Sequence, residues 1–254
     1  MKRFMALGAA VLALGAGAAA IGQKATAGGA VAAQTDGGLY VSSGTIEGPA
    51  RPGAYGPVTV ANHSAADLTV TVTPRQWTQA ANGSVAPNRR GGLSGVSVSE
   101  SSFTLKPGEQ RQLTVNIASI PSSGALYGAL EVVGLPADVA KRKGVVLGYR
   151  VVSAIRMLPA APKAGVSAGK IKPAKGTATL PIKNTGNTLD VVSARVDVKT
   201  SRGTQRVSSS VKILPGKTIN LSLGKLQKGA ASAKITVRQK GKTVVNTTKK
   251  FTVK

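Results

Sequence analysis

The sequence predicts an all-β protein built of two antiparallel β-sandwiches that follow an N-terminal export signal. Three observations lead to this prediction: short β-branched runs separated by turn residues, a strand plan that occurs twice, and the lack of a convincing amphipathic helix after the export signal. The chain has 254 residues, and its 34 Lys and Arg against 9 Asp and Glu give a formal net charge of +25. Its hydrophobic fraction of 42% is too high for a wholly disordered chain.

Residues 1–27 have the features of a signal peptide. Lys2 and Arg3 form a positive start, and an uncharged run rich in Ala, Leu and Gly follows over Met5–Ile21. Small residues at positions 25 and 27 match the pattern that signal peptidase recognises. We therefore expect cleavage after Ala27.

Two alternatives remain for this segment. Cleavage after Ala20 or Ala32 fits the same small-residue rule. A retained membrane anchor is also compatible with the composition, although the apolar run is short for a span of about 20 residues. We expect an exported protein, associated with the cell envelope or secreted, with a flexible mature N-terminus at 28–38 and no transmembrane span after cleavage.

The strand plan is clearest around the Asn62–Asp67 turn. Leu68–Thr73 alternates apolar residues with threonine, the pattern of a half-buried strand, and Asn, Ser and Asp supply the turn before it. The same order of runs and turns restarts near residue 180. The matched pairs are Val58–Thr73 with Leu180–Val198, Phe103–Gly108 with Val211–Gly216, and Gly124–Val132 with Gly229–Val237.

Two copies of one strand plan favour two sandwiches over a single large barrel. Each copy has about 90–120 residues, regular short strands and Pro-Gly turns, as in small antiparallel sandwiches. We expect the first sandwich at 39–159 and the second at 160–254. The Pro-, Ala- and Gly-rich stretch Pro159–Gly165 has no strand alternation, which indicates a linker there.

A further set of segments belongs to the first copy. After the asparagine turn come Trp77, Phe103–Gly108, Leu126–Val132 and Tyr149–Arg156. This layout resembles the immunoglobulin-like domains of bacterial exported proteins. Two related groups share it: the amino-terminal domain of PapD-like pilus-assembly chaperones and the peptidoglycan-binding domain that accompanies WxL surface proteins. The resemblance covers about residues 39–160 and implies an immunoglobulin-like fold.

The chaperone resemblance implies a particular binding site. PapD-like chaperones hold the terminal carboxylate of their client with two basic residues, on the first and last strands of this domain. Arg156 matches the second position, whereas the expected first strand, Leu39–Ile46, has no Lys or Arg. Arg51 fills the first position only in an altered register. The alternating apolar run before Arg156, which would pair with a client strand, is short.

The positive charge is concentrated in the second copy. Residues 1–33 hold three basic and no acidic residues, 34–159 hold eleven and seven, and 160–254 hold twenty and two. Since a field of this strength raises the local concentration of anionic partners, it indicates contact with an anionic polymer. The alternative is a solvated lysine surface that keeps the protein soluble.

The basic residues Lys234, Arg238, Lys240 and Lys242 alternate with apolar ones in a run that we expect to be one strand. They are the candidate polymer-binding residues. For an exported protein the partner is an anionic cell-wall polymer or surface protein. Nucleic acid is not expected, because of the export signal and because Phe251 is the sole aromatic residue of 160–254, leaving no stacking platform.

The residues offer little for catalysis. There is no cysteine, and His63 is the single histidine. Glu100, Glu109 and Glu131 fall on separate expected elements, whereas a glycosidase needs two facing carboxylates. We therefore expect no enzyme, no metal and no cofactor. Trp77 is expected to pack in the core of the first sandwich.

Two functions remain. The first is a non-catalytic envelope-binding or structural protein whose second sandwich contacts anionic wall or surface polymers. The alternative is a PapD-like chaperone for secreted pilus or surface subunits, which lends a strand to its client and loses it on Arg156→Ala.

Overall fold

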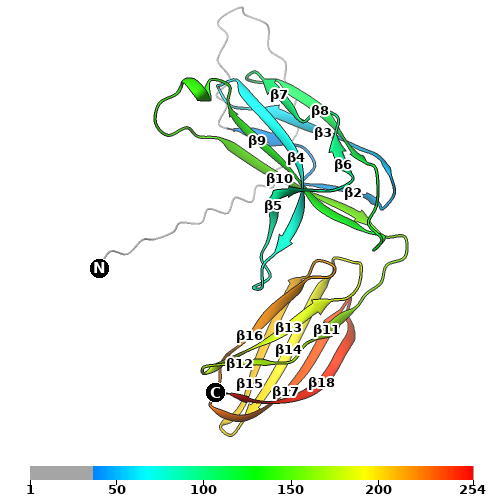
Figure 1. Cartoon of the computed structure of the whole chain (residues 1–254), viewed down its shortest axis with the longest axis vertical. Coiled ribbons are helices and arrows are strands. Elements are labelled where there is room, and N and C mark those ends of the chain that lie inside the picture. The colour runs from blue at the N-terminus through cyan, green and yellow to red at the C-terminus, as the bar shows by residue number, and fades with distance from the viewer. Residues whose placement is uncertain (1–36, 254) are drawn as a thin grey trace, which may run out of the picture. The chain divides into compact units, whose positions relative to one another are not determined.

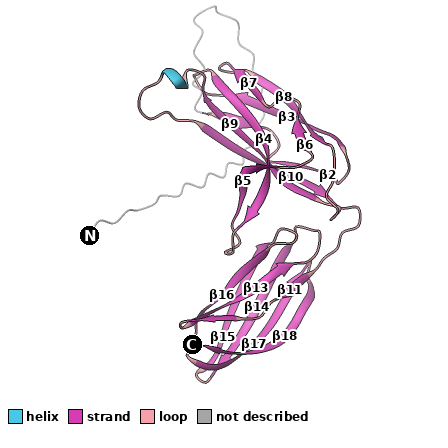
Figure 2. Cartoon of the chain, viewed as in Figure 1, coloured by secondary structure: helices cyan, strands magenta, loops and turns pink. Residues whose placement is uncertain are grey.

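The computed structural model describes residues 37–253. The predicted signal peptide and residues 28–36 of the predicted N-terminal segment lie outside the described residues. The described part is all-β and contains four sheets and one short 3-10 helix, η1 (Val139–Lys141), as Figures 1 and 2 show. The predicted fold class is thus confirmed. Within residues 37–253 no helix has the length and apolar character needed to cross a membrane.

Two sheets from the first part of the chain share one hydrophobic core and form the first sandwich. One sheet has the strand order β1-β3-β8-β6, and the other has β2-β10-β9-β4-β5, with β7 also pairing with β4. The strands are β1 (Leu39–Val41), β2 (Thr45–Pro49), β3 (Gly53–Asn62), β4 (Leu68–Gln79), β5 (Val85–Gly92), β6 (Val96–Val98), β7 (Ser102–Leu105), β8 (Gln110–Ile117), β9 (Leu126–Pro136) and β10 (Tyr149–Leu158). Alternate residues of both sheets, such as Val60, Val70 and Leu113, are buried between them.

Two further sheets share a separate core and form the second sandwich. In one, β13 pairs with β11, β12 and β16, and the other has the order β15-β14-β17-β18. The strands are β11 (Val166–Ala168), β12 (Lys172–Ala174), β13 (Thr177–Asn184), β14 (Val191–Thr200), β15 (Gly203–Lys212), β16 (Thr218–Lys225), β17 (Gly229–Gln239) and β18 (Lys242–Val253). Leu180, Val196 and Ile235 are among its fully buried residues.

The repeat seen in the sequence has a counterpart in the strand pairing. β3 pairs with β8 in the first sandwich as β13 pairs with β16 in the second. Likewise, β4, β9 and β10 are neighbours in the order in which β14, β17 and β18 are neighbours. One strand plan, used twice, therefore produces the same ladder of neighbours twice.

Asn62 ends β3 and is fully buried. Its Nδ2 donates to the carbonyls of Ala66 and Leu105 at 2.8 and 3.0 Å, and its Oδ1 accepts from the amide of Ser64 at 2.9 Å. Its own amide and carbonyl pair with the turn at 108–109. One side chain thus connects a strand end, the turn after it and the end of β7.

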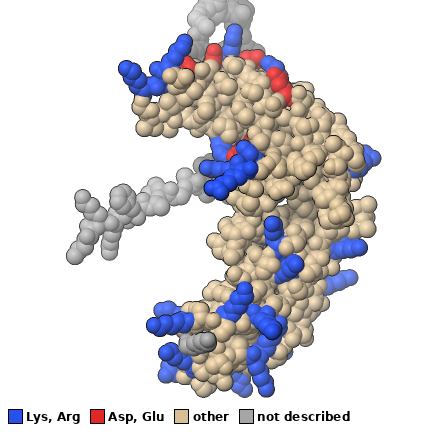
Figure 3. Space-filling model, in the orientation of Figure 1, with Lys and Arg blue, Asp and Glu red and all other residues tan. Residues whose placement is uncertain are grey.

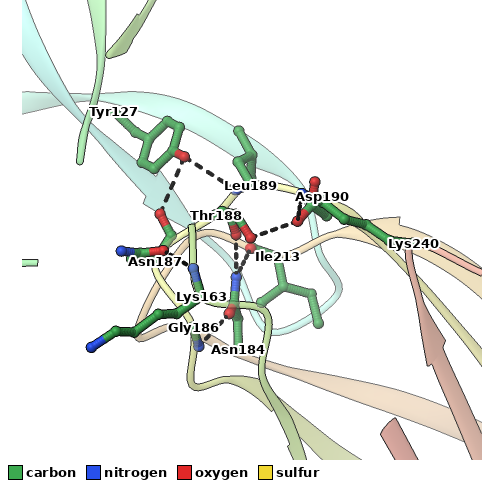
Figure 4. A network of polar contacts seen from close by, with 10 residues as sticks. All are labelled: Tyr127, Lys163, Asn184, Gly186, Asn187, Thr188, Leu189, Asp190, Ile213 and Lys240. Atoms are coloured by element: carbon green, nitrogen blue, oxygen red, sulfur yellow. Dashed lines mark hydrogen bonds and ion pairs between the residues drawn. The ribbon is translucent and has the colours of Figure 1, made fainter. Parts of the chain in front are cut away.

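Asn184 does the same at the end of β13, as Figure 4 shows. Its Nδ2 donates to the carbonyls of Thr188 and Ile213 at 2.9 and 2.7 Å, and its Oδ1 accepts from the amide of Gly186. Its own amide and carbonyl pair with the turn at 216–217. Because buried carbonyls need a donor, each asparagine makes its loop compatible with burial.

The predicted first strand over residues 39–46 is wrong in one respect: it is two strands in different sheets. β1 pairs with β3, whereas β2 pairs with β10 in a parallel arrangement. Ser43 has a left-handed backbone conformation (φ 65°) between them, and Ser42 Oγ accepts from the amide of Thr59. This break lets the chain cross from one sheet to the other, and the β2–β10 pair departs from the expected antiparallel pattern.

The edge strand β18 carries Lys249 on the side that faces the core. Lys249 alternates with the half-buried residues Val245, Thr247 and Phe251 on this side of the strand, and its Nζ donates to the carbonyls of Ala168 and Gly169, both at 2.8 Å. A charged side chain that points inward from an edge strand disfavours pairing with another chain. Lys249 therefore disfavours strand addition at this edge of the sheet, whose other edge is β15.

We expect Asn62→Ala to destabilise the first sandwich. The change removes a donor from the buried carbonyl of Leu105 and from the carbonyl of Ala66, which keeps the hydroxyl of Ser64 as a donor at 3.1 Å. Since a buried group that loses its partner costs roughly 1–3 kcal/mol, the free energy of unfolding should fall by about 1–3 kcal/mol. Urea unfolding followed by the fluorescence of Trp77, the one tryptophan, measures this.

Asn82→Ala is the matched control. Asn82 Oδ1 accepts from the amide and hydroxyl of Ser84 in the same local pattern as Asn62 with Ser64, but in an exposed turn. Its replacement should cost less than about 1 kcal/mol, since solvent replaces the lost bonds. Equal losses for the two variants would contradict the role given to burial.

Candidate functional site

β10 has an open edge over half of its length. β9 pairs with it from Tyr149 to Met157, but on the other side β2 pairs only with Ala154–Leu158. Among the described residues, no strand pairs with this side of Tyr149–Ser153.

The backbone groups along the open edge can be assigned from their neighbours. The amide of Ala154 donates to Gly44 and the carbonyl of Leu158 accepts from Ala50, so even-numbered residues point away from β9. By the alternation of a strand, the amides and carbonyls of Arg150 and Val152 also face this side. They offer the hydrogen-bonding pattern that an added strand requires.

Apolar side chains continue from this edge into the β9–β10 connection. Val145 and Leu147 are 94% and 81% exposed, and Tyr149 is 36% exposed. Together with Val151, which packs partly against the core, they occupy alternate positions over residues 145–151. The strand begins at Tyr149, whose ring lies against Gly38, and residues 145–148 before it are not part of a strand. Side chains at this spacing lie on one face when the chain is extended, so the segment can present an apolar row to a partner strand.

A nearly buried carboxylate holds two arginines beside this edge. Glu131 on β9 is 5% exposed and pairs with Arg75 of β4 at 2.9 Å and with Arg150 of β10. Burial opposes its ionisation, but the hydrogen bonds from Arg150 and Arg75 outweigh burial and lower the pKa of Glu131. The guanidinium of Arg150 is therefore fixed against β9.

Arg156, the predicted client-binding residue, has an internal partner. In the parallel register of β2 and β10 it lies opposite Glu47, and its Nη1 is 2.9 Å from a carboxylate oxygen of that residue. The last pair of this register is Pro49 with Leu158, so Arg51 lies beyond it and does not face Arg156. The altered register considered for Arg51 is thus wrong, and an acidic residue occupies the position across from Arg156.

The structure separates the four basic residues predicted on one strand. Lys234 and Arg238 lie on the outward side of β17, opposite the buried Ile235 and Val237. The strand ends at Gln239, because Lys240 and Gly241 both have positive φ and form the two-residue turn of the β17–β18 hairpin.

The other two basic residues therefore lie at the hairpin. Lys240 Nζ is 3.5 Å from Asp190, and Lys242 begins β18. Since β17 stops before them, the prediction of one continuous strand through residue 242 is wrong. Only Lys234 and Arg238 share the outward side of that strand.

Further basic side chains surround Lys234 and Arg238 on the outward side of the same sheet. We call this surface the basic face. It comprises Arg195, Lys199, Arg206, Lys212, Lys234, Arg238 and Lys250. Figure 3 shows Lys and Arg over the second sandwich, whereas the acidic side chains visible in that view gather around the first. Sequence alternation revealed the β17 part of this face, but its β14 and β15 parts depend on strand pairing.

The remaining candidate residues have structural partners. Glu100 pairs with Arg111 at 2.8 Å, and the carboxylate of Glu109 accepts from the amide of Lys106. His63 contacts the ring of Tyr40 edge-on, with 5.9 Å between ring centroids. Within residues 37–253 no three potential metal-ligating side chains gather.

Trp77 is not in the core, contrary to expectation. It is half-buried on β4 at the point where that strand extends beyond the core and pairs with β5. A shift of register between Arg75 and Trp77 accompanies this extension. The fully buried residues of β4 end at Val72, and Trp77 lies five residues further along the strand. Its side chain is therefore half-exposed and not part of the core.

Comparison with known proteins gives a structural likeness only. No family model matches the sequence, and no curated protein matches it. A chain of a chaperone–tip adhesin complex of CFA/I fimbriae biogenesis is similar in structure, with 13% identity, a TM-score of 0.51, and coverage of 84% of this chain and 98% of that one. The likeness shows the immunoglobulin-like fold of fimbrial chaperones.

Two further solved structures have weaker likeness. The chaperone YadV has 13% identity and a TM-score of 0.47, with coverage of 84% of this chain and 99% of that one. The Escherichia coli chaperone DraB has 16% identity and a TM-score of 0.44, with coverage of 85% and 97%.

Glu131 makes the stability of the first sandwich depend on pH. A carboxyl whose pKa is lowered in the folded state stabilises the fold above its unfolded pKa of about 4.3, and this contribution is lost as the pH falls through the lower folded-state value. We therefore expect the stability difference between the wild type and Glu131→Gln to shrink on acidification from about pH 5 to pH 3.

Urea unfolding at several pH values checks this expectation. Glu109→Gln, at an exposed carboxylate, is the control for the loss of one surface charge. A difference between the wild type and Glu131→Gln that stays constant across this range would contradict the assignment.

Proposed function

We propose that this chain is an exported, non-catalytic chaperone or assembly factor that holds an extracytoplasmic subunit by accepting one of its β-strands along β10. The observation that carries the proposal is the open edge at 149–153, continued by exposed apolar side chains at alternate positions. Addition of a strand to a sheet edge supplies main-chain hydrogen bonds, and alternate side chains supply specificity.

Burial of exposed apolar side chains favours residues 145–151 as the contact. Val145 and Leu147 are almost fully exposed, and burying such a side chain contributes about 1.5–3 kcal/mol. A large exposed apolar row is unusual on a protein that works alone. The arginine beside the edge is held against β9 by Glu131, which keeps its charge away from the apolar row.

The structural comparison supports the same proposal. The complex of CFA/I fimbriae biogenesis joins a chaperone to a tip adhesin, and the likeness covers 98% of the matched chain at a TM-score of 0.51. The predicted signal peptide supports export. Together they favour a client that is itself exported, such as a pilus or surface subunit.

We expect Val145→Ser with Leu147→Ser to weaken client binding by tenfold or more. The double variant removes the exposed apolar row but leaves the core untouched, because neither side chain is buried. Binding of tagged wild-type and variant chains to a client purified from envelope extract measures the change. The matched control is Val191→Ser with Val244→Ser, two exposed valines of the second sandwich, which should bind as the wild type does.

Two measurements separate strand capture from anchoring by a carboxylate. Client binding should slow hydrogen exchange at the amides of Arg150 and Val152, which face the open edge. Arg156→Ala should weaken binding less than the double serine variant, because its guanidinium is already paired with Glu47. Unchanged exchange at both amides, or complete loss of binding in Arg156→Ala alone, would contradict capture at this edge.

A second function is favoured by the charge of residues 160–254, with twenty basic and two acidic residues. We propose that the second sandwich also attracts an anionic wall or surface polymer of the envelope. Both acids already have basic partners, since Asp197 pairs with Arg206 and Arg195, and Asp190 pairs with Lys240. Most of the cations therefore remain available to an outside partner.

Retention through these cations should be sensitive to salt. The screening length falls from about 10 Å at 0.1 M to about 3 Å at 1 M, so the mature chain should be released from its envelope fraction between these concentrations. Sedimentation of the envelope fraction, followed by assay of the supernatant, measures release. Retention that is unchanged at 1 M salt would contradict an electrostatic mechanism.

A further inference from the structure

The register of the second sandwich places the cations of the basic face in an ordered pattern. On the two central strands, the outward pairs across β14 and β17 are Lys199 with Ser232, Asp197 with Lys234, Arg195 with Thr236, and Ser193 with Arg238. Each pair contains one cation, and the cations alternate between the two strands. They therefore follow a zigzag path along the middle of the sheet.

Strand geometry sets the spacing of this path. Successive outward residues of one strand are about 6.7 Å apart, and neighbouring strands are about 4.8 Å apart. Successive cations of the zigzag thus have backbone positions about 8 Å apart. The long side chains of Lys and Arg can adjust this distance, so the path suits a chain with one negative charge every 6–8 Å or so.

Three of the four cations have no acidic partner within residues 37–253. Lys199, Lys234 and Arg238 form no ion pair there, whereas Arg195 is 3.3 Å from Asp197. That carboxylate is also 2.6 Å from Arg206, whose hydrogen bond lowers the pKa of Asp197. The single acid of the face lies on the path, opposite Lys234, and its charge is offset by two arginines.

Hydroxyl groups line the path between the cations. Ser193 and Ser210 are hydrogen-bonded to each other at 2.9 Å, and Ser208 lies opposite Arg195. Ser208, Ser210, Thr236 and Arg238 contribute to a hollow of about 490 Å³, and Lys199, Ser232 and Lys250 contribute to another of about 630 Å³. The surface thus combines fixed positive charge with neutral donors.

We propose that the basic face binds a linear phosphodiester polymer without bases, which lies along the zigzag from Lys199 to Arg238. This inference deepens the second proposed function, on which it rests, by naming the ligand chemistry and the residues. Phosphate oxygens accept from guanidinium, ammonium and hydroxyl groups together, which matches the donors present. The repeat of charge along such a polymer matches the spacing of the cations.

The same face is poorly suited to nucleic acid. The single aromatic residue of its four strands is Phe251, which packs against the core. Its half-buried ring lines the larger hollow, so the face offers one ring at most and no series of rings on which successive bases can stack, a contact that contributes about 1–3 kcal/mol per base in proteins that bind single strands. A phosphodiester polymer without bases does not need aromatic rings for binding.

The experiment compares the full mature chain with two matched double variants. Lys234→Gln with Arg238→Gln removes two adjacent cations of β17 in the zigzag. Lys172→Gln with Lys183→Gln removes the same charge from exposed positions of β12 and β13, in the opposite sheet. All four side chains are exposed, and circular dichroism confirms that each variant is folded.

The probe is poly(glycerol phosphate), and the readout is its Kd as a function of salt concentration. We expect the zigzag variant to bind at least tenfold more weakly, with the slope of log Kd against log salt reduced by about 1.5 for two lost contacts. The control variant should change by less than threefold. Equal weakening in both variants would overturn the proposal, since diffuse charge would then explain binding.

Three further probes test the chemistry. Polygalacturonate carries carboxylates, oligo(dT) carries phosphodiesters with bases, and phosphatidylglycerol vesicles carry phosphate on a lipid surface. Tighter binding to any of these than to poly(glycerol phosphate) would overturn the ligand class, and weaker binding to all three supports it. A zigzag variant that loses poly(glycerol phosphate) but remains on the envelope would contradict this polymer as the retaining partner while leaving electrostatic retention intact.

Discussion

The buried side-chain amide at the end of β3 and of β13 is the interaction on which both sandwiches depend. Asn62 and Asn184 each donate to two loop carbonyls, and each accepts from the turn that follows. Loops at the end of a sandwich expose polar backbone groups to an apolar interior, and an unsatisfied group there costs more than a bond contributes. One asparagine per copy removes this conflict, so the strands on either side can enter the core in a fixed register.

The lengths over which the strands pair determine which edges of the two sandwiches are left open. In the first sandwich the break at Ser43 moves the chain to the second sheet, so that β2 covers only half of β10. In the second sandwich β14 and β17 pair without interruption over eight residue pairs, and their outward cations are thereby brought into one pattern. The open edge thus arises because β2 pairs with only part of β10, and the basic face arises because β14 and β17 pair over eight residues.

The sequence predicted well what depends on local alternation. The period-two pattern located β4 and β17, and the repeated asparagine turn indicated that the plan occurs twice. It failed where a distant strand decides the outcome. Trp77 is half-exposed because β4 outruns the sheet opposite, and Arg156 is paired because β2 places Glu47 across from it. The end of β17 at Gln239 had a local signal, since Gly241 follows a polar residue at a hairpin turn, but charge alternation through Lys242 obscured it.

The inward lysine of β18 makes the corresponding edges of the two sandwiches unequal. β18 occupies in the second sandwich the place that β10 occupies in the first, yet Lys249 ties it to the carbonyls of Ala168 and Gly169. A repeat of two identical open edges would let each copy join two neighbours, and such units extend into fibres. Because Lys249 disfavours strand addition at β18, extension of such a fibre through both corresponding edges in turn is disfavoured.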